Sequence, residues 1–334
     1  MIKDYWRNKY SSIEEEASSS EFEELLYVHS LIINASVAFF ERHGMPHINV
    51  PVTTSSASSP MSPGSDSSPV EAIIDGKKIL LTDSAQFYLE YACRATKNGC
   101  YYYGHSFRDE EPDERHLSQF THIEAELPCS LDSLKKFIIA YIKDVSLKIY
   151  EQYPHKAQMN DETRRRIDYL IDKKEFISIT YADACNYLKS VESSVTLNKK
   201  TGKLLITANG EKALLEKYGN FLWLENWDRM NVPFYQAVNQ STGLAINADL
   251  LCGIGETIGA GQRHCNADEV FKALDEQKID KKNYLWYTEL KRLSPMLTSG
   301  FGMGVERYLM WLMDIRDIRS VELFPRNRNQ SGKF

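Results

Sequence analysis

Apolar positions recur at helical spacing over two long stretches in the first half of the chain. Residues 22–40 place an apolar side chain at every third or fourth position, and Ser20 with Glu23 forms a capping-box pattern at their start. This stretch ends at Gly44, a residue that suits the position after a helix. Residues 131–150 repeat the spacing, and residues 84–95 form a shorter stretch. The pattern therefore predicts three helices.

Segments of β character lie between and after these helices. Strands are expected over residues 45–52, 71–74, 78–82, 101–107, 120–127 and 321–325, and β character also returns after residue 221. Asp75-Gly76 marks one turn, and the polar residues 111–115 join two strands into an antiparallel hairpin. Because strands come from both ends of the chain, we expect an α+β fold: one antiparallel sheet flanked by helices.

Two stretches are less regular. Residues 53–69 are rich in Ser, Thr, Pro and Gly, which predicts a mobile loop. Such a segment is either a linker or a loop over a site, and the β character that follows favours the loop. Residues 154–220 are charged and mixed, with a hairpin turn at 198–203. We expect a single domain over residues 1–334, with an extension over 1–20 and a variable insertion over 154–220.

Composition and charge narrow the class of protein. The chain has 334 residues, of which 43% are hydrophobic and 26% charged, as in an ordinary globular protein. No apolar run approaches the length of a membrane span and the start has no signal-peptide profile, so we expect a cytoplasmic location without a membrane partner. The six cysteines form no CxxC pair, which disfavours a zinc or redox site. The net charge of −6 does not indicate a nucleic-acid ligand, although a local patch can bind one.

The hairpin brings polar and aromatic side chains to one face. With a period of two, Arg108 and Glu110 share a face, and Phe120, His122, Glu124 and Glu126 do so on the partner strand. From their chemistry, Arg108 suits a phosphate, Phe120 a purine ring and Glu124 an ammonium group. A surface row of ion pairs beside a buried Phe is the structural alternative.

A second group of candidates follows a glycine-rich turn. Closely spaced glycines, among them Gly302 and Gly304, let the backbone approach a ligand, and the helix expected after them begins close to Arg307. The spacing fits neither a dinucleotide fingerprint nor a P-loop. Arg108 and Arg307 together indicate a triphosphate held from two sides, since a guanidinium keeps its charge at any working pH.

Three further sets of residues suit smaller ligand groups. Asp249 and Glu256 are brought together if a turn forms at residues 253–255, and their oxygens suit magnesium that carries phosphates. Arg263 suits a substrate carboxylate, and an ordinary structural ion pair is the alternative. Ser84 suits a small polar substrate, as does Gln86, although both also fit the start of a helix.

The motifs together resemble a known family. Residues 107–126 are similar to motif 2 of class II aminoacyl-tRNA synthetases, residues 300–307 with 324–326 to motif 3, and residues 42–51 to the looser motif 1 at the dimer interface of that family. Residues 249–263 match a stretch of the aspartyl/asparaginyl branch. The chain is most similar to asparaginyl-tRNA synthetases and to the asparagine synthetases related to them.

The resemblance implies roles for the candidates. ATP and Mg²⁺ would be the cofactors, an amino acid the substrate and a homodimer the assembly. Arg108 and Arg307 would be catalytic. The residues implied to bind ATP are Arg108, Glu110, Arg115, His116, Phe120, Gly302, Gly304 and Arg307; those implied to bind the amino acid are Ser84, Gln86, Glu124 and Arg263; Asp249 and Glu256 would hold magnesium.

Two departures from the family guide the functional hypotheses. Leu89 stands where aspartate enzymes have a lysine, which disfavours a lysine-bound aspartate side chain. Only residues 1–20 precede the first predicted helix, so the resemblance implies that the anticodon-binding OB-fold is absent. We therefore expect an AMP-forming amide ligase that adenylates aspartate or an analogue and transfers the acyl group to ammonia or another amine, with tRNA a disfavoured partner. The alternatives are a truncated asparaginyl-tRNA synthetase-like enzyme and a non-catalytic regulatory paralogue.

Overall fold

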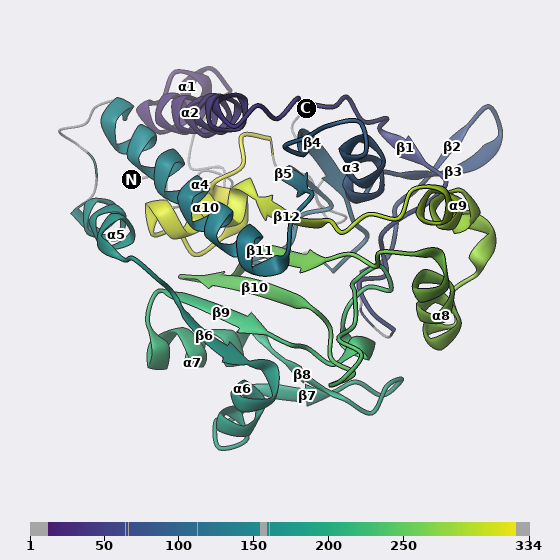
Figure 1. Cartoon of the computed structure of the whole chain (residues 1–334). Coiled ribbons are helices and arrows are strands. Elements are labelled where there is room, and N and C mark those ends of the chain that lie inside the picture. The colour runs from purple at the N-terminus through teal and green to yellow at the C-terminus, as the bar shows by residue number, and fades with distance from the viewer. Residues whose placement is uncertain are drawn as a thin grey trace.

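A seven-stranded sheet forms the centre of the molecule (Figure 1). The computed structural model describes residues 13–63, 65, 67–111, 113–153, 159 and 161–324. In sheet order the strands are β4 (Cys100–Phe107), β5 (Gln119–Leu127), β12 (Ser299–Gly304), β11 (Gly255–Gln262), β10 (Asn247–Cys252), β9 (Phe221–Glu225) and β6 (Ile177–Thr180). All neighbours are antiparallel except β6 and β9. The predicted α+β class is confirmed, with one parallel pair at the edge.

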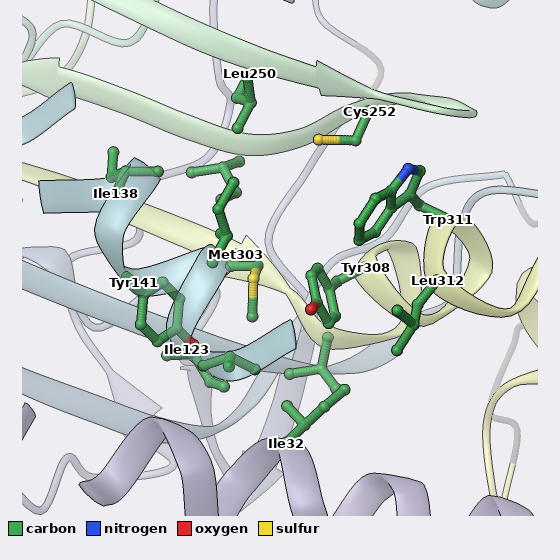
Figure 2. Close-up of a cluster of buried hydrophobic side chains, with 14 of the residues drawn as sticks. Ile32, Ile123, Ile138, Tyr141, Leu250, Cys252, Met303, Tyr308, Trp311 and Leu312 are labelled. Atoms are coloured by element: carbon green, nitrogen blue, oxygen red, sulfur yellow. The ribbon is translucent and has the colours of Figure 1, made fainter. Parts of the chain in front are cut away.

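Helices cover one face of this sheet and enclose the main core. They are α2 (Ser20–Arg42), α4 (Leu131–Gln152), α5 (Asp161–Asp172) and α10 (Val305–Met313), with the short α1 (Ile13–Ala17) ahead of α2. Figure 2 shows Met303 of β12 among Ile138 and Tyr141 of α4 and Tyr308 of α10. The alternation along β5 explains the packing, because Ile123 and Ala125 enter this core while Glu124 and Glu126 point to the opposite face.

Smaller elements partly cover the opposite face and leave a space between them. At one end, α3 (Gln86–Cys93) packs on β4 and β5; at the other, α6 (Tyr181–Leu188) and α7 (Ala208–Tyr218) pack on β9. α8 (Ala267–Gln277) and α9 (Leu285–Leu293) pack beside α3. Two small sheets complete the fold: β1 (Thr53–Thr54), β3 (Lys77–Leu81) and β2 (Glu71–Ile74), and the hairpin of β7 (Val195–Leu197) and β8 (Leu204–Ile206). Single 3-10 turns occur at Arg229–Asn231, Lys281–Tyr284 and Ile318–Ser320.

The predicted helices and one predicted hairpin are present in the structure, with differences at the helix ends. The N-cap of α2 is Ser19, whose hydroxyl accepts from the Phe22 amide, and not Ser20. The helix expected over residues 84–95 is limited to α3, and the hairpin turn at 198–203 joins β7 to β8 as predicted.

Two predicted strands are wrong. Residues 45–52 make only an isolated bridge to Tyr101, because Pro46 and Pro51 have no amide hydrogen to extend a ladder. Residues 321–324 form no strand, since the Val321 carbonyl bonds the buried His29 ring of α2 at 2.6 Å instead. Pro325 and Arg326 lie outside the described residues.

The predicted loop over residues 53–69 begins with β1 and continues as irregular chain. Its serines are largely buried, and Ser58 and Ser59 donate to the carboxylate of Asp83, which is itself buried. The loop is thereby attached next to Ser84. Among the described residues, no helix is long and apolar enough to cross a membrane.

Candidate active site

A cavity of about 340 Å³ opens on the face of the sheet opposite the main core. This volume lies within the range of small-molecule sites. Its floor includes a flat patch of backbone, because Gly259 pairs with Gly302 and Gly261 with Gly300 across β11 and β12. A side chain at Gly300 would collide with Glu126 and Arg263, whose charged groups lie directly above it.

All the residues that the sequence predicted for the site line this one cavity. They are Ser84, Gln86, Arg108, Glu110, Arg115, His116, Phe120, Glu124, Asp249, Glu256, Arg263, Gly302, Gly304 and Arg307. They come from α3, the β4–β5 hairpin, the β10–β11 hairpin and the β12–α10 junction. Leu89 also lines it, as do Met61, Ser65 and Ser67 of the loop, so the loop lies over the site as predicted. The individual roles of these residues stay predictions.

At one end of the cavity the charged groups are paired. Arg263 is buried, and its Nη2 lies 3.1 Å from Oε2 of Glu126, with Nε donating to the same carboxylate. A third contact runs from Nη1 of Arg263 to Oε1 of Gln236 at 3.4 Å. Burial raises the pKa of Glu126 even though Arg263 opposes this, while Glu126 raises the pKa of Arg263 despite its burial.

A second ion pair lies beneath this end and does not line the cavity. Nζ of Lys291, from α9, is 2.5 Å from Oε2 of Glu90, from α3, and both side chains are fully buried. The Tyr287 hydroxyl donates to the same carboxylate at 2.9 Å. Burial alone would raise the pKa of Glu90, but Lys291 and Arg263 lower it below its usual value.

Glu124 lies between the two ends of the cavity. The hydroxyl of Ser84 and the amide of Ala85 donate to its two oxygens, each at 2.5 Å. Burial raises the pKa of Glu124 to about 7, against the lowering effect of these donors and of Arg108. The neighbouring His122 is buried, and burial with Arg108 and Arg307 holds the pKa of its ring well below the usual value. The carboxyl therefore gains or loses a proton near neutrality, whereas the imidazole stays neutral.

At the other end, cationic groups keep donors available. Arg108 lies over the Phe120 ring, with its guanidinium carbon 5.3 Å from the ring centre. The Nε groups of Arg108 and Arg115 are buried and have no hydrogen-bond partner among the described residues. Buried N–H groups without partners are unfavourable, so they indicate a missing acceptor such as a phosphate oxygen.

Arg115 is nevertheless held in place on one side. Its Nη2 lies 2.6 Å from Oε2 of Glu211, near the start of α7, and both side chains are largely buried. The same Glu211 oxygen accepts from the Glu256 amide at 3.3 Å. Glu211 lies in residues 154–220, the stretch predicted to be a variable insertion, in which the sequence indicated little chemistry.

The two predicted metal ligands converge over one glycine. A β-carbon added at Gly259 would lie 3.2 Å from Oε1 of Glu256 and 3.7 Å from Oδ1 of Asp249. Burial, Glu256 and Glu211 raise the pKa of Asp249 well above its usual value, as expected for neighbouring buried carboxylates. Within the part of the chain that the structure describes, no group of three or more such side chains forms a complete metal site. The oxygens of Asp249 and Glu256 suit a magnesium ion that would also take oxygens from a phosphate and water.

Sequence reasoning missed several residues around this cavity. Glu90, Lys291, Tyr287 and Gln236 hold the residues of the paired end, and Glu211 holds Arg115. Glu90 ends the Gln-x-Tyr-Leu-Glu arrangement over residues 86–90, which resembles that of the asparagine enzymes, although no role was predicted for it. The other four residues lie in no recognisable motif. Glu126 was placed on the correct face, but its pairing with Arg263 was not foreseen.

The sheet, its helices and this cavity define a class II synthetase fold, and comparisons with known proteins agree. The family described as "tRNA synthetases class II (D, K and N)" matches residues 5–328. The chain belongs to this family. Its class II synthetase homologues are ATP-dependent ligases.

Two curated relatives and two solved structures illustrate the similarity. The chain is 29% identical to the asparagine–tRNA ligase of Thermoplasma acidophilum over 92% of its own length and 70% of that protein. It is 31% identical to that of Phytoplasma australiense over 75% of its length, but spans only 56% of that relative. The asparaginyl-tRNA synthetase of Pyrococcus horikoshii in complex with asparaginyl-adenylate has the same fold, with a TM-score of 0.84 and 24% sequence identity. The match covers 95% of this chain and 71% of that one. For the asparaginyl-tRNA synthetase of Entamoeba histolytica in complex with asparaginyl-adenylate, the TM-score is 0.79 and the sequence identity is 25%. That match covers 97% of this chain and 73% of the other.

These comparisons correct the preferred functional hypothesis. A tRNA-independent amide ligase is not supported, because the curated relatives named above are tRNA ligases. The alternative of an asparaginyl-tRNA synthetase-like enzyme agrees better with them, and tRNA is no longer the disfavoured partner.

Proposed function

We propose that the chain activates asparagine with ATP and transfers the asparaginyl group to tRNA. A carboxylate oxygen of asparagine attacks the α-phosphorus of ATP, the bond from that phosphorus to the bridging oxygen breaks, and pyrophosphate leaves. A hydroxyl of the terminal tRNA nucleotide then attacks the carbonyl carbon of the adenylate, loses its proton to solvent and displaces AMP. No covalent bond to the enzyme is required.

One observation supports this proposal above the others: the two ends of the cavity differ in how far their cationic groups are already paired. Among the described residues, the buried Nε groups of Arg108 and Arg115 have no hydrogen-bond acceptor, whereas Arg263 is already neutralised by Glu126. A ligand that is anionic at one end and neutral at the other satisfies both. Asparagine beside a nucleoside triphosphate has this distribution of charge.

The proposed roles follow from position. Arg108 contacts the α-phosphate and stabilises the charge that develops on it, and Arg115, His116 and Arg307 contact the outer phosphates. The adenine stacks on Phe120. A magnesium ion held by Asp249 and Glu256 would neutralise charge on the leaving pyrophosphate.

The amino-acid end has a complementary arrangement. Glu124 receives the α-ammonium group, with Ser84 beside it, and Gln86 and Arg263 face the carboxamide. Leu89 presents an apolar surface where a lysine would favour a carboxylate. The names of the relatives support asparagine as the substrate and tRNA as the acceptor.

Pyrophosphate exchange into ATP tests the first step, and charging of a tRNA pool with labelled amino acid tests the second. We expect exchange that depends on asparagine and magnesium, and asparaginyl-tRNA as the product. Exchange without tRNA charging, with free asparagine or another amide formed from aspartate, would contradict the tRNA step. No exchange with either amino acid would overturn the proposal in favour of a non-catalytic role.

A further inference from the structure

The ion pair of Glu90 and Lys291, beneath the amino-acid end, cannot contact a ligand in the cavity directly. Glu90 and Lys291 are fully buried and do not line the cavity. Burying two charges is costly, and an apolar pair of similar size often stabilises a protein equally well. The position of this pair therefore calls for an explanation besides stability.

The pair is connected to both residues that face the substrate side chain. Oε1 of Glu90 accepts from Nε2 of Gln86 at 3.0 Å. On the other side, Nζ of Lys291 donates to the backbone carbonyl of His264 at 2.7 Å, directly after Arg263. The orientation of the Gln86 amide and the backbone that supports Arg263 are thus fixed by the same two charges.

The two ion pairs around the proposed side-chain pocket carry charges that sum to zero, while Glu124 is left to balance the α-ammonium group of the substrate. Glu90 and Glu126 contribute two negative charges, and Lys291 and Arg263 two positive ones. A carboxamide entering this space leaves the balance unchanged, whereas a carboxylate adds a buried charge without a counter-charge. At low effective dielectric, one such charge within a few ångströms is worth more than a tenfold change in affinity.

We propose that Glu90 and Lys291 are positioning residues that keep the side-chain pocket electrically neutral and thereby select a carboxamide over a carboxylate substrate. The inference rests on the proposed function and deepens it. The pair acts through Gln86 and Arg263 and does not touch the substrate itself.

A purely structural role for the pair, as a clamp between α3 and α9, makes a different prediction. Loss of a clamp impairs both substrates in parallel, whichever partner is removed. Control of charge predicts that the two substitutions shift the preference between aspartate and asparagine in opposite directions. Glu90→Gln leaves the pocket with an extra positive charge, and Lys291→Met leaves it with an extra negative one.

The test compares kcat/KM for aspartate and asparagine in pyrophosphate exchange. In Glu90→Gln we expect the ratio of aspartate to asparagine to rise about tenfold or more, with the KM for ATP unchanged. In Lys291→Met the ratio should stay at or below the wild-type value. In Glu90→Gln/Lys291→Met, which restores neutrality, it should return to within about threefold of wild type.

Lys135→Met is the matched control, since it breaks the ion pair with Glu225 away from the cavity. It should leave the ratio unchanged. If Glu90→Gln does not fold, the double variant still decides: retained preference for asparagine supports control by charge, and lost preference overturns it. Parallel loss of both activities without a change in ratio also overturns the inference while the proposed function stands. A wild-type protein that activates neither amino acid contradicts the proposed function itself.

Discussion

The two ends of the cavity use the same residue types in opposite ways. At the amino-acid end, the charge of Arg263 is neutralised by Glu126, and Lys291 is likewise paired with Glu90. At the nucleotide end, Arg108 and Arg115 each keep a buried Nε without a partner in the described part of the chain. One end is electrostatically complete before a ligand arrives, and the other is not.

This difference follows from what each end is proposed to bind. A triphosphate brings several negative charges, so its site holds cations that keep some donors without a partner among the described residues, beside the contacts that Arg115 and Arg307 already make. A carboxamide brings no charge, so its site gains selectivity by leaving no charge uncompensated. Substitutions at the nucleotide end should therefore affect activity more than stability, and those at the amino-acid end should affect both.

The largest expected effect is on activity at the nucleotide end. Arg108→Ala removes a cation from the α-phosphate, and we expect pyrophosphate exchange to fall about a thousandfold, the scale found for preorganised donors to a developing charge. Stability should change little, because Arg108 forms no ion pair with the described residues that would be broken. Thermal unfolding measured beside exchange checks both statements.

Arg292→Ala is the control for this variant. Arg292 is mostly exposed, and within the described residues its ion pair is with Glu289 one helical turn away, so both exchange and unfolding should stay near wild type. An Arg108→Ala protein with activity within tenfold of wild type would contradict a role for Arg108 at the α-phosphate.

The next effect is on stability at the amino-acid end. Glu126→Gln leaves the buried Arg263 without its counter-charge, and removing one partner of a buried pair typically costs about 3–5 kcal/mol. Glu151→Gln makes the same change in an exposed pair with Lys148 and should cost about 1 kcal/mol or less. Urea unfolding of both variants measures the contrast, and equal losses would refute the difference between the two settings.

Local sequence patterns predicted β4, β5 and the long helices, and indicated strands after residue 221 without giving their bounds. They missed β6, and residues 300–304, expected as a glycine-rich turn, form strand β12. The alternation along β5 placed Phe120, His122, Glu124 and Glu126 on one face, and all four line the cavity. The errors arose where backbone hydrogen bonding depends on distant chain. Residues 45–52 have strand-like composition but two prolines, and the Val321 carbonyl is taken by His29.

The candidate site was predictable where its residues lie in motifs. Arg108 and Arg307 stand at recognisable spacings, and their neighbourhood in space follows from the pairing of β5 with β12. Lys291 and Tyr287 were not predictable, since Tyr287 meets Glu90 across 197 residues. Glu211 contacts Arg115 across 96 residues, from a stretch in which the sequence showed no motif. Such contacts are set by tertiary packing and leave no local signal.

A smaller effect, on pH dependence, is expected between the two ends. Because the pKa of Glu124 is raised to about 7, its carboxyl is largely protonated at pH 6 in the free protein. An ammonium group favours the ionised form, so affinity for asparagine should rise about tenfold from pH 6 to pH 8 and then level off. Calorimetric titrations across this range measure it. Glu124→Gln should bind more weakly and lose the slope; a slope that persists in this variant assigns the titration to another group.

The smallest expected effect concerns Glu211, which belongs to neither end by sequence but joins the nucleotide end in space. Glu211→Gln keeps a hydrogen-bonding group beside Arg115 and removes one negative charge. The phosphates then meet less repulsion, so the KM for ATP at saturating magnesium should fall about two- to threefold. The carboxylates that would hold magnesium lose a negative neighbour at the same time. The magnesium concentration for half-maximal exchange should therefore rise by a similar factor. Glu216→Gln, on the exposed side of the same helix, should change neither constant. Opposite shifts in the two constants distinguish an electrostatic role for Glu211 from misplacement of Arg115, which would raise the KM for ATP and leave the magnesium requirement unchanged.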